Sequence, residues 1–135
     1  MLTRSPTEFL TTFDRLTPDA PATARAAFLV TPCGFHLAAE SARDNRYMAM
    51  DQVPDPLRAL AEHTALAEAL RADVPVVSFP GDIDCPDGVF PNNVFGTAPG
   101  RLIIGRMRHP VRQHEAGRAD IRALIGAGRE IVDLS

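Results

Sequence analysis

A polar loop at residues 85–97, Cys-Pro-Asp-Gly-Val-Phe-Pro-Asn-Asn-Val-Phe-Gly-Thr, constrains the fold of this chain more than any other stretch. Two prolines and a glycine fix its backbone around a single carboxylate, Asp87. The apolar runs at residues 74–79 and 101–105 flank the loop, and each predicts a strand. A rigid polar loop between two buried strands is a typical place for a binding carboxylate in an α/β protein. The alternative is that Asp87 only caps a helix or stabilises a turn.

Apolar strand runs and amphipathic helix patterns alternate along the chain. Strands are predicted at residues 26–31, 74–79, 101–105 and 130–134. One helix is predicted to begin at Asp55-Pro56 and to pack through Leu57, Leu60, Thr64, Ala67 and Leu70. A second is predicted to pack through Ile121, Leu124 and Ile125 and to end at Gly126 and Gly128. The order strand, helix, strand, strand, helix, strand predicts an α/β or α+β fold.

Residues 1–24 predict a helical extension followed by a linker. Ser5 suits the cap, Pro6 suits the first helical position, and Glu8 completes a capping box. The expected apolar face comprises Phe9, Phe13 and Leu16. The second predicted domain then covers residues 25–135.

The composition of the chain narrows its class and its partners. The 135 residues are 45% hydrophobic and 23% charged, as in one soluble domain with a modest core. A formal net charge of -3 argues against a nucleic-acid or acidic-membrane partner, and no apolar run is long enough to cross a bilayer. Cys33 and Cys85, without a secretory signal, predict free thiols in a reducing cytoplasm. Because no second ligand pair accompanies Cys33 and His36, no metal and no cofactor are expected.

The run Pro-Asp-Gly-Val-Phe-Pro-Asn-Asn at residues 86–93 resembles the signature of the guanidino-group-modifying (pentein) superfamily. This superfamily contains arginine deiminases, amidinotransferases and dimethylargininases. The two asparagines look most like the citrulline-utilisation hydrolase branch, since dimethylargininases usually have acidic residues there. The resemblance implies a partial pentein α/β-propeller, with roughly two of its five strand-strand-helix-strand modules in a chain of this size. Residues 85–97 are called the signature loop below.

The resemblance also implies a substrate site. A guanidinium is a planar cation whose natural partner is a carboxylate, and the matching motif places Asp87 in that role. Asn92 and Asn93 are expected to hold the loop or to contact the substrate. Arg112, followed by Glu115, resembles an Arg-Arg-x-Glu stretch whose arginine binds the substrate α-carboxylate. The alternative is that the basic segment, with Arg106, Arg108 and Arg112, is only a solvated loop.

The superfamily reaction needs a nucleophilic cysteine and a proton-transferring histidine. In the resembled proteins both lie at positions beyond Ser135, so no catalytic residue is predicted in this chain. Cys85 does not match the nucleophile, and neighbouring carboxylates should raise its pKa. His36, a lone loop histidine, is given no role. The predicted function is the substrate-binding, N-terminal portion of an amidinotransferase or an arginine- or citrulline-type hydrolase. The alternative is a non-catalytic binding or oligomerising module.

Two propeller modules without the others would leave strand edges open. The edges at residues 26–31 and 130–134 are apolar, and exposed edges favour pairing with other chains. The N-terminal helix could cover one of them. A homo-oligomer burying more than about 1,000 Å² is therefore expected.

Overall fold

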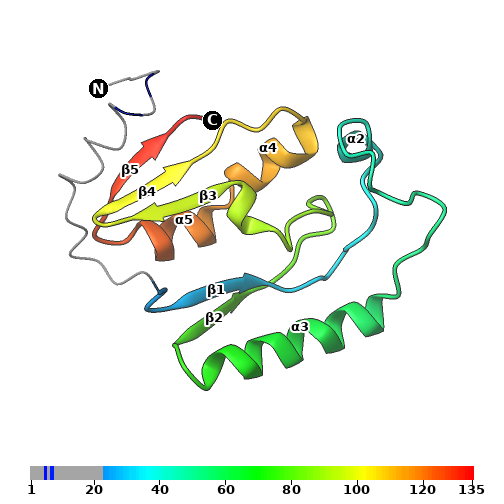
Figure 1. Ribbon diagram of the computed structural model, residues 1–135, viewed down its shortest axis with the longest axis horizontal. Coiled ribbons are helices and arrows are strands. Elements are labelled where there is room, and N and C mark those ends of the chain that lie inside the picture. The colour runs from blue at the N-terminus through cyan, green and yellow to red at the C-terminus, as the bar shows by residue number, and fades with distance from the viewer. Residues whose placement is uncertain (1–4, 6, 8–22) are drawn as a thin grey trace.

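The computed structural model describes Ser5, Thr7 and residues 23–135 (Figure 1). Its strands are β1 (Ala27–Val30), β2 (Val76–Phe79), β3 (Phe95–Ala98), β4 (Arg101–Ile104) and β5 (Glu130–Asp133). Its α-helices are α2 (Ala39–Ala42), α3 (Pro56–Arg71), α4 (Pro110–Ala116) and α5 (Ala119–Gly126), and η1 (Pro91–Asn93) is a short 3-10 helix. The predicted apolar face of the N-terminal helix lies outside the described residues, so the division at residue 24 stays a prediction.

The described strands form two small sheets. In the first, β1 and β2 are parallel, with Ala27 opposite Val76. In the second, β3 runs antiparallel to β4, and β4 runs parallel to β5. Strands β3, β4 and β5 with α5 form one strand-strand-helix-strand unit, and β1, α3 and β2 form a strand-helix-strand unit beside it (Figure 1). The predicted mixed α/β fold is confirmed, and neither sheet closes into a barrel among the described residues.

A hydrophobic core cluster of the described residues joins the two sheets. Leu102 and Ile104 on β4 are completely buried, while Ile103 between them is 37% exposed. This alternation follows from the two-residue period of a strand, which directs every second side chain to the core. The rest of the core cluster comes from both sheets and from the helices: Val30, Phe79, Val94, Phe95, Ala116 and Ile121.

The four predicted strands are present, and so are the two helices predicted within the described residues, now α3 and α5. The helix at Asp55-Pro56 begins as expected, because the Asp55 carboxylate accepts hydrogen bonds from the amides of Leu57 (2.9 Å) and Arg58 (3.1 Å). The prediction did not include β3, which starts within the signature loop, or α4, which forms where only a basic segment was recognised. His109-Pro110 marks the start of α4, since proline suits the first helical position.

Two predicted helix faces need correction. Of the residues expected to pack from α3, only Ala67 is buried, whereas Leu57 is 80% and Leu60 47% exposed. Figure 1 shows the reason: the N-terminal half of α3 extends past the ends of β1 and β2, so no described sheet lies against it. On α5, Ile121 is buried as predicted, but Leu124 is 51% exposed.

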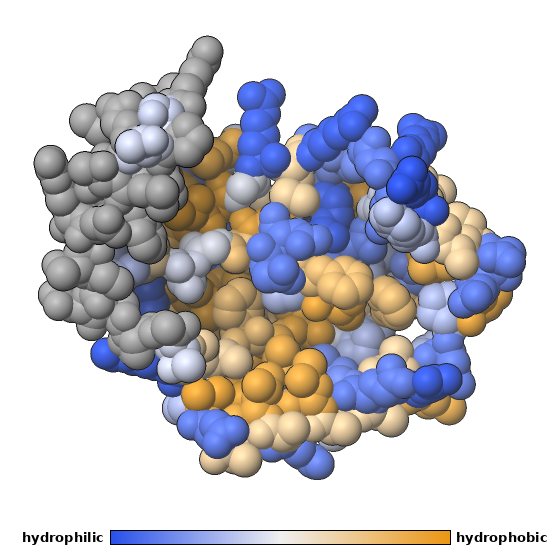
Figure 2. Space-filling view, viewed as in Figure 1, coloured by the Kyte–Doolittle hydropathy of each residue, from blue (hydrophilic) through white to orange (hydrophobic). Residues whose placement is uncertain are grey.

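The surface combines polar and apolar areas. Figure 2 shows apolar side chains (orange) gathered in the region of β1 and β2. A cavity of about 500 Å³ opens there, between β1 and β3, lined by Phe28, Val77, Phe95 and Ile125 among others. No helix in the part of the chain that the structure describes has both the length and the apolar character needed to cross a membrane.

Candidate functional site

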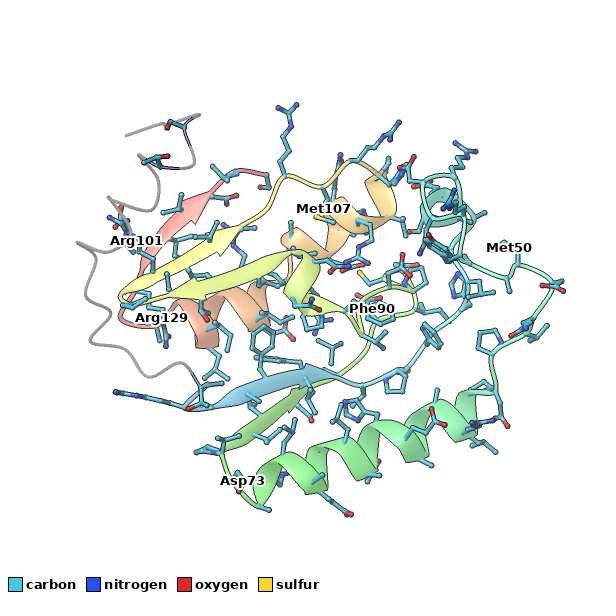
Figure 3. All side chains as sticks on the ribbon, in the orientation of Figure 1. Met50, Asp73, Phe90, Arg101, Met107 and Arg129 are labelled. Atoms are coloured by element: carbon cyan, nitrogen blue, oxygen red, sulfur yellow. The ribbon has the colours of Figure 1, made fainter. Side chains whose placement is uncertain are left out.

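A pocket of about 480 Å³ lies where three segments meet. The chain between β1 and α3 contributes Phe35 and Ser41, the signature loop contributes Asp87, Phe90 and Asn93, and α4 contributes Arg112. Two further landmarks of the pocket are labelled in Figure 3: Phe90 in the signature loop, and Met107 in the segment between β4 and α4. Because the signature loop lies on the connection from β2 of one sheet to β3 of the other, the pocket forms at the boundary between the sheets.

Successive turns in the signature loop hold Asp87 in the pocket wall. The Gly88 amide donates to the Cys85 carbonyl (2.9 Å), and the Phe90 amide donates to the Asp87 carbonyl (2.9 Å). A side chain at Gly88 would place its Cβ 2.9 Å from the Cys85 carbonyl oxygen, so the tight turn requires glycine. Asp87 is only 6% exposed, and its carboxylate accepts a hydrogen bond from the Ser41 hydroxyl. The loop therefore presents a buried carboxylate to the pocket.

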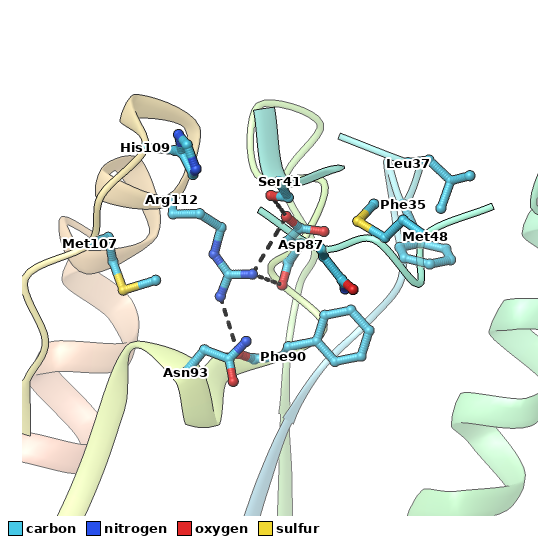
Figure 4. Close-up of a pocket in the computed structure, with 11 residues that line it drawn as sticks. Phe35, Leu37, Ser41, Met48, Asp87, Phe90, Asn93, Met107, His109 and Arg112 are labelled. Atoms are coloured by element: carbon cyan, nitrogen blue, oxygen red, sulfur yellow. Dashed lines mark hydrogen bonds and ion pairs between the residues drawn. The ribbon is translucent and has the colours of Figure 1, made fainter. Parts of the chain in front are cut away.

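Arg112 and Glu115 complete a buried charged cluster with Asp87. One terminal nitrogen of Arg112 lies 3.6 Å from the Asp87 carboxylate, and the other lies 3.1 Å from the Glu115 carboxylate. The guanidinium also donates to the Asp87 and Phe90 carbonyls at 3.4 Å, as the contacts in Figure 4 illustrate. Arg112 is 6% and Glu115 3% exposed. Arg112 thus joins α4 to the signature loop.

The cluster contains two carboxyl groups and one guanidinium, so its charges do not balance when both acids are ionised. Burial raises the pKa of Glu115 to about 7; the negative charge of Asp87 adds to this effect, and Arg112 opposes it. One Glu115 oxygen and Nε of Arg112 are buried and have no hydrogen-bond partner among the described residues. Glu115 can therefore exchange a proton near neutral pH.

Asp44 connects the two sides of the pocket rim. Its carboxylate lies 2.9 Å from an Arg108 nitrogen and 2.6 Å from Nε2 of His109. His109 lines the pocket and is the residue immediately before α4 (Figure 4). This contact links the segment that follows α2 to the start of α4.

The predicted site residues fall into two groups. Asp87, Asn93 and Arg112 line the same pocket. Asn92 instead lines the cavity between β1 and β3, and its amide donates to the Asn93 side chain at 3.4 Å. The alternative of a solvated basic segment describes Arg108, whose side chain is 78% exposed, but not the buried Arg112.

No sequence pattern indicated Ser41 or His109 as parts of this pocket. Ser41 lies 46 residues from its partner Asp87, and His109 lies 65 residues from Asp44. Neither contact follows from a local pattern. The proline after His109 does indicate the helix start that positions its ring.

The structure does not support a catalytic role for Cys85 or His36. Cys85 is buried, and its pKa is raised to about 11, first by burial and then by the charges of Asp82 and Glu115. This agrees with the expectation that it is not an activated thiolate. The exposed His36 forms a local hydrogen bond of 2.8 Å with the Gly34 carbonyl. The described residues contain no group of three or more side chains that could hold a metal ion.

Comparison with known families identifies the chain. Residues 31–134 match the family model described as N,N dimethylarginine dimethylhydrolase, eukaryotic. The chain belongs to this dimethylarginine dimethylhydrolase family. The superfamily resemblance inferred from the signature loop is therefore confirmed. A sequence comparison with curated proteins finds no match.

Solved structures of similar fold belong to the same superfamily. One is a dimethylarginine dimethylaminohydrolase from Pseudomonas aeruginosa, a cysteine-to-serine mutant complexed with citrulline. It is 23% identical to this chain with a TM-score of 0.64, and the match covers 84% of this chain and 43% of that protein. A second is a dimethylarginine dimethylaminohydrolase adduct with 4-chloro-2-hydroxymethylpyridine (23% identity, TM-score 0.62, 83% and 41% covered). A third is the binary complex of an AgrE cysteine-to-alanine mutant with L-arginine (19% identity, TM-score 0.63, 84% and 16% covered).

These likenesses show that the chain has the fold of the dimethylarginine dimethylhydrolase family. The chain spans less than half the length of each of the three matched proteins.

Proposed function

We propose that this chain is the substrate-binding portion of a hydrolase or amidinotransferase that acts on the guanidino or ureido group of a small amino acid. The observation that carries the proposal is the oppositely charged pair Asp87 and Arg112, both 6% exposed and both lining one pocket. Buried charges are costly unless they are paired, so two of them lining one pocket mark it as a candidate site for a charged ligand. The ligands of the similar structures, citrulline and L-arginine, support the substrate class.

The distances within the pocket support a specific mode of binding. Asp87 offers a carboxylate to a cationic group, and Arg112 offers a guanidinium to a carboxylate. Their closest atoms are 3.6 Å apart, so the two side chains pair with each other, and a ligand guanidinium and α-carboxylate would bind by replacing that contact. Asn93 lines the same pocket and can donate or accept a hydrogen bond with a neutral or charged side-chain group. We assign Asn92 the accompanying role of holding Asn93.

The proposed reaction is cleavage of a C–N bond through a cysteine adduct. A thiolate attacks the guanidino or ureido carbon, a histidine protonates the departing nitrogen, and water then releases the product from the enzyme. Because Cys85 is buried with a raised pKa, we do not assign it as the nucleophile, and we assign neither reactive group to a described residue. The described residues supply recognition only, and we assign no cofactor.

A second candidate, a non-catalytic binding or oligomerising module, is favoured by exposed apolar side chains. Val53 is 93%, Leu57 80% and Ile83 71% exposed. Large exposed apolar areas are typical of protein interfaces. A module of this kind would form a stable assembly and would not need to bind an amino acid.

Calorimetric titration with L-arginine, L-citrulline and a methylated arginine tests the proposal. We expect at least one ligand to bind the wild-type chain and Asp87→Asn to weaken binding by tenfold or more. The matched control is Asp84→Asn, which removes the same charge from an exposed position three residues away and should bind normally. If none of the ligands binds, or if both variants weaken binding equally, the pocket is not the substrate site. Oligomer formation without binding would favour the second candidate.

A further inference from the structure

The charge of the buried cluster depends on one residue, Glu115. With Asp87 and Glu115 both ionised, the cluster has two negative charges and one positive charge. With Glu115 protonated, Asp87 and Arg112 alone form a neutral pair. Glu115 does not line the pocket, but it contacts Arg112, which does, and it is 3% exposed. A charge in so dry a position is weakly screened and acts on whatever the pocket contains.

Glu115 is also held in a fixed position behind the pocket. It lies on α4 three residues after Arg112 and contacts the guanidinium at 3.1 Å, while that guanidinium reaches the signature loop carbonyls. Its second oxygen is buried and has no partner among the described residues. This oxygen can carry a proton without breaking a hydrogen bond with the described protein.

We propose that Glu115 is a specificity-determining residue: its negative charge makes the pocket favour an amino acid with a cationic side chain, and its protonation removes that preference. The inference rests on the proposed function, because it concerns ligands of the same pocket. L-arginine and L-citrulline share the amino-acid end and differ by one positive charge on the side chain. The ratio of their affinities therefore isolates the effect of pocket charge.

The charged groups around Glu115 and its burial determine the pH range in which it loses its proton. The charged and titratable groups that face Glu115 are Arg112 on the same helix, Asp87 and Cys85 from the signature loop, and Arg118 between α4 and α5. Burial raises the pKa of Glu115 to about 7, so its charge is gained or lost across neutral pH. The preference for arginine over citrulline should thus increase between pH 6 and pH 8.

The test is calorimetric titration of the full chain with L-arginine and L-citrulline at pH 6, 7 and 8. In the wild-type chain we expect the arginine-to-citrulline affinity ratio to rise on the order of tenfold with pH, as one nearby unit charge would cause. Glu115→Gln keeps the side-chain shape without the charge, so its ratio should be low and constant with pH. Glu68→Gln, an exposed change on α3, is the control and should behave like the wild-type chain.

Each outcome decides between explanations. A ratio independent of pH in the wild-type chain overturns the inference even if Glu115→Gln does not fold, since the wild-type profile needs no variant. A ratio that still changes with pH in folded Glu115→Gln assigns the effect to a group other than Glu115 and also overturns the inference. If neither ligand binds at any pH, the proposed function fails together with the inference. Binding of both ligands with a constant ratio refutes the role of Glu115 alone.

Discussion

Replacing Arg112 by methionine should strongly destabilise the fold, because it removes the cation between two buried acids. Methionine retains much of the side-chain length but leaves Asp87 and Glu115 without their common partner. Removal of one member of a buried ion pair costs about 3–5 kcal/mol. The hydrogen bonds to the Asp87 and Phe90 carbonyls are long, at 3.4 Å, and add little. For a domain of this size, roughly 3.5 °C is lost per kcal/mol, which gives a decrease in Tm of about 10–18 °C.

The loss should depend on pH in a defined direction. The pKa of Glu115 is raised to about 7 in the folded chain, above its ordinary value of 4.5. The stability that protonated Glu115 contributes is therefore fully present below about pH 4.5 and is lost as pH rises through about 7. Without Arg112, which lowers this pKa, the penalty for ionising Glu115 increases. The difference in unfolding free energy between Arg112→Met and wild type should thus be larger at pH 8 than at pH 5.

Urea unfolding at pH 5 and pH 8 measures both effects. Arg108→Met is the matched control, since it removes the same charge four residues earlier from a side chain that is 78% exposed. An exposed ion pair contributes no more than about 1 kcal/mol. The double variant Arg112→Met/Glu115→Gln should lose most of the pH dependence. A loss below about 1 kcal/mol for Arg112→Met at pH 8, equal to that of Arg108→Met, would refute the view that the cluster is buried and coupled.

Three further predictions concern the core, the rim and the assembly. Leu102→Ala should lower the unfolding free energy by about 2–5 kcal/mol, because the side chain is fully buried; a loss under about 1 kcal/mol in urea unfolding would contradict the position of β4 in the core. Asp44→Asn should accelerate hydrogen exchange in residues 43–50, since it weakens the contacts with Arg108 and His109; unchanged exchange would mean that the rim does not depend on this contact. The chain should form a homo-oligomer at micromolar concentration, and a stable monomer in light scattering would show that the open strand edges are covered within the chain.

The sequence predicts the buried strands well because their apolar runs are local signals. It misses β3, because Gly96 and Ala98, which are poor strand formers, alternate there with Phe95 and Thr97 and leave no continuous apolar run. Its pairing with β4, which places Phe95 opposite Ile104, is what makes it a strand. The exposure of Leu57 on α3 was equally hidden, since helical periodicity identifies an apolar face but does not say what covers it.

For the candidate site, sequence motifs identify some of the residues, but the contacts between them follow only from the fold. Asp87 and Arg112 could be identified from the motifs around them, and the structure places both at one pocket. That Arg112 is buried between two acids, rather than extended into solvent, follows only from the packing of α4 against the signature loop. Ser41 could not be predicted, because its contact with Asp87 depends on how the chain returns after β1.

The position of the signature loop links the stability of this fold to its binding site. The loop makes up most of the segment between β2 and β3, which carries the chain from one sheet to the other, and it includes the start of β3. Its residues Val94 and Phe95 lie in the core shared by both sheets, while Asp87 faces the pocket. A shift of one sheet relative to the other would therefore change the separation between Asp87 and Arg112, because Arg112 belongs to a helix that packs with the second sheet through Ala116. Substitutions in the common core, far from the pocket, should for this reason weaken ligand binding as well as stability.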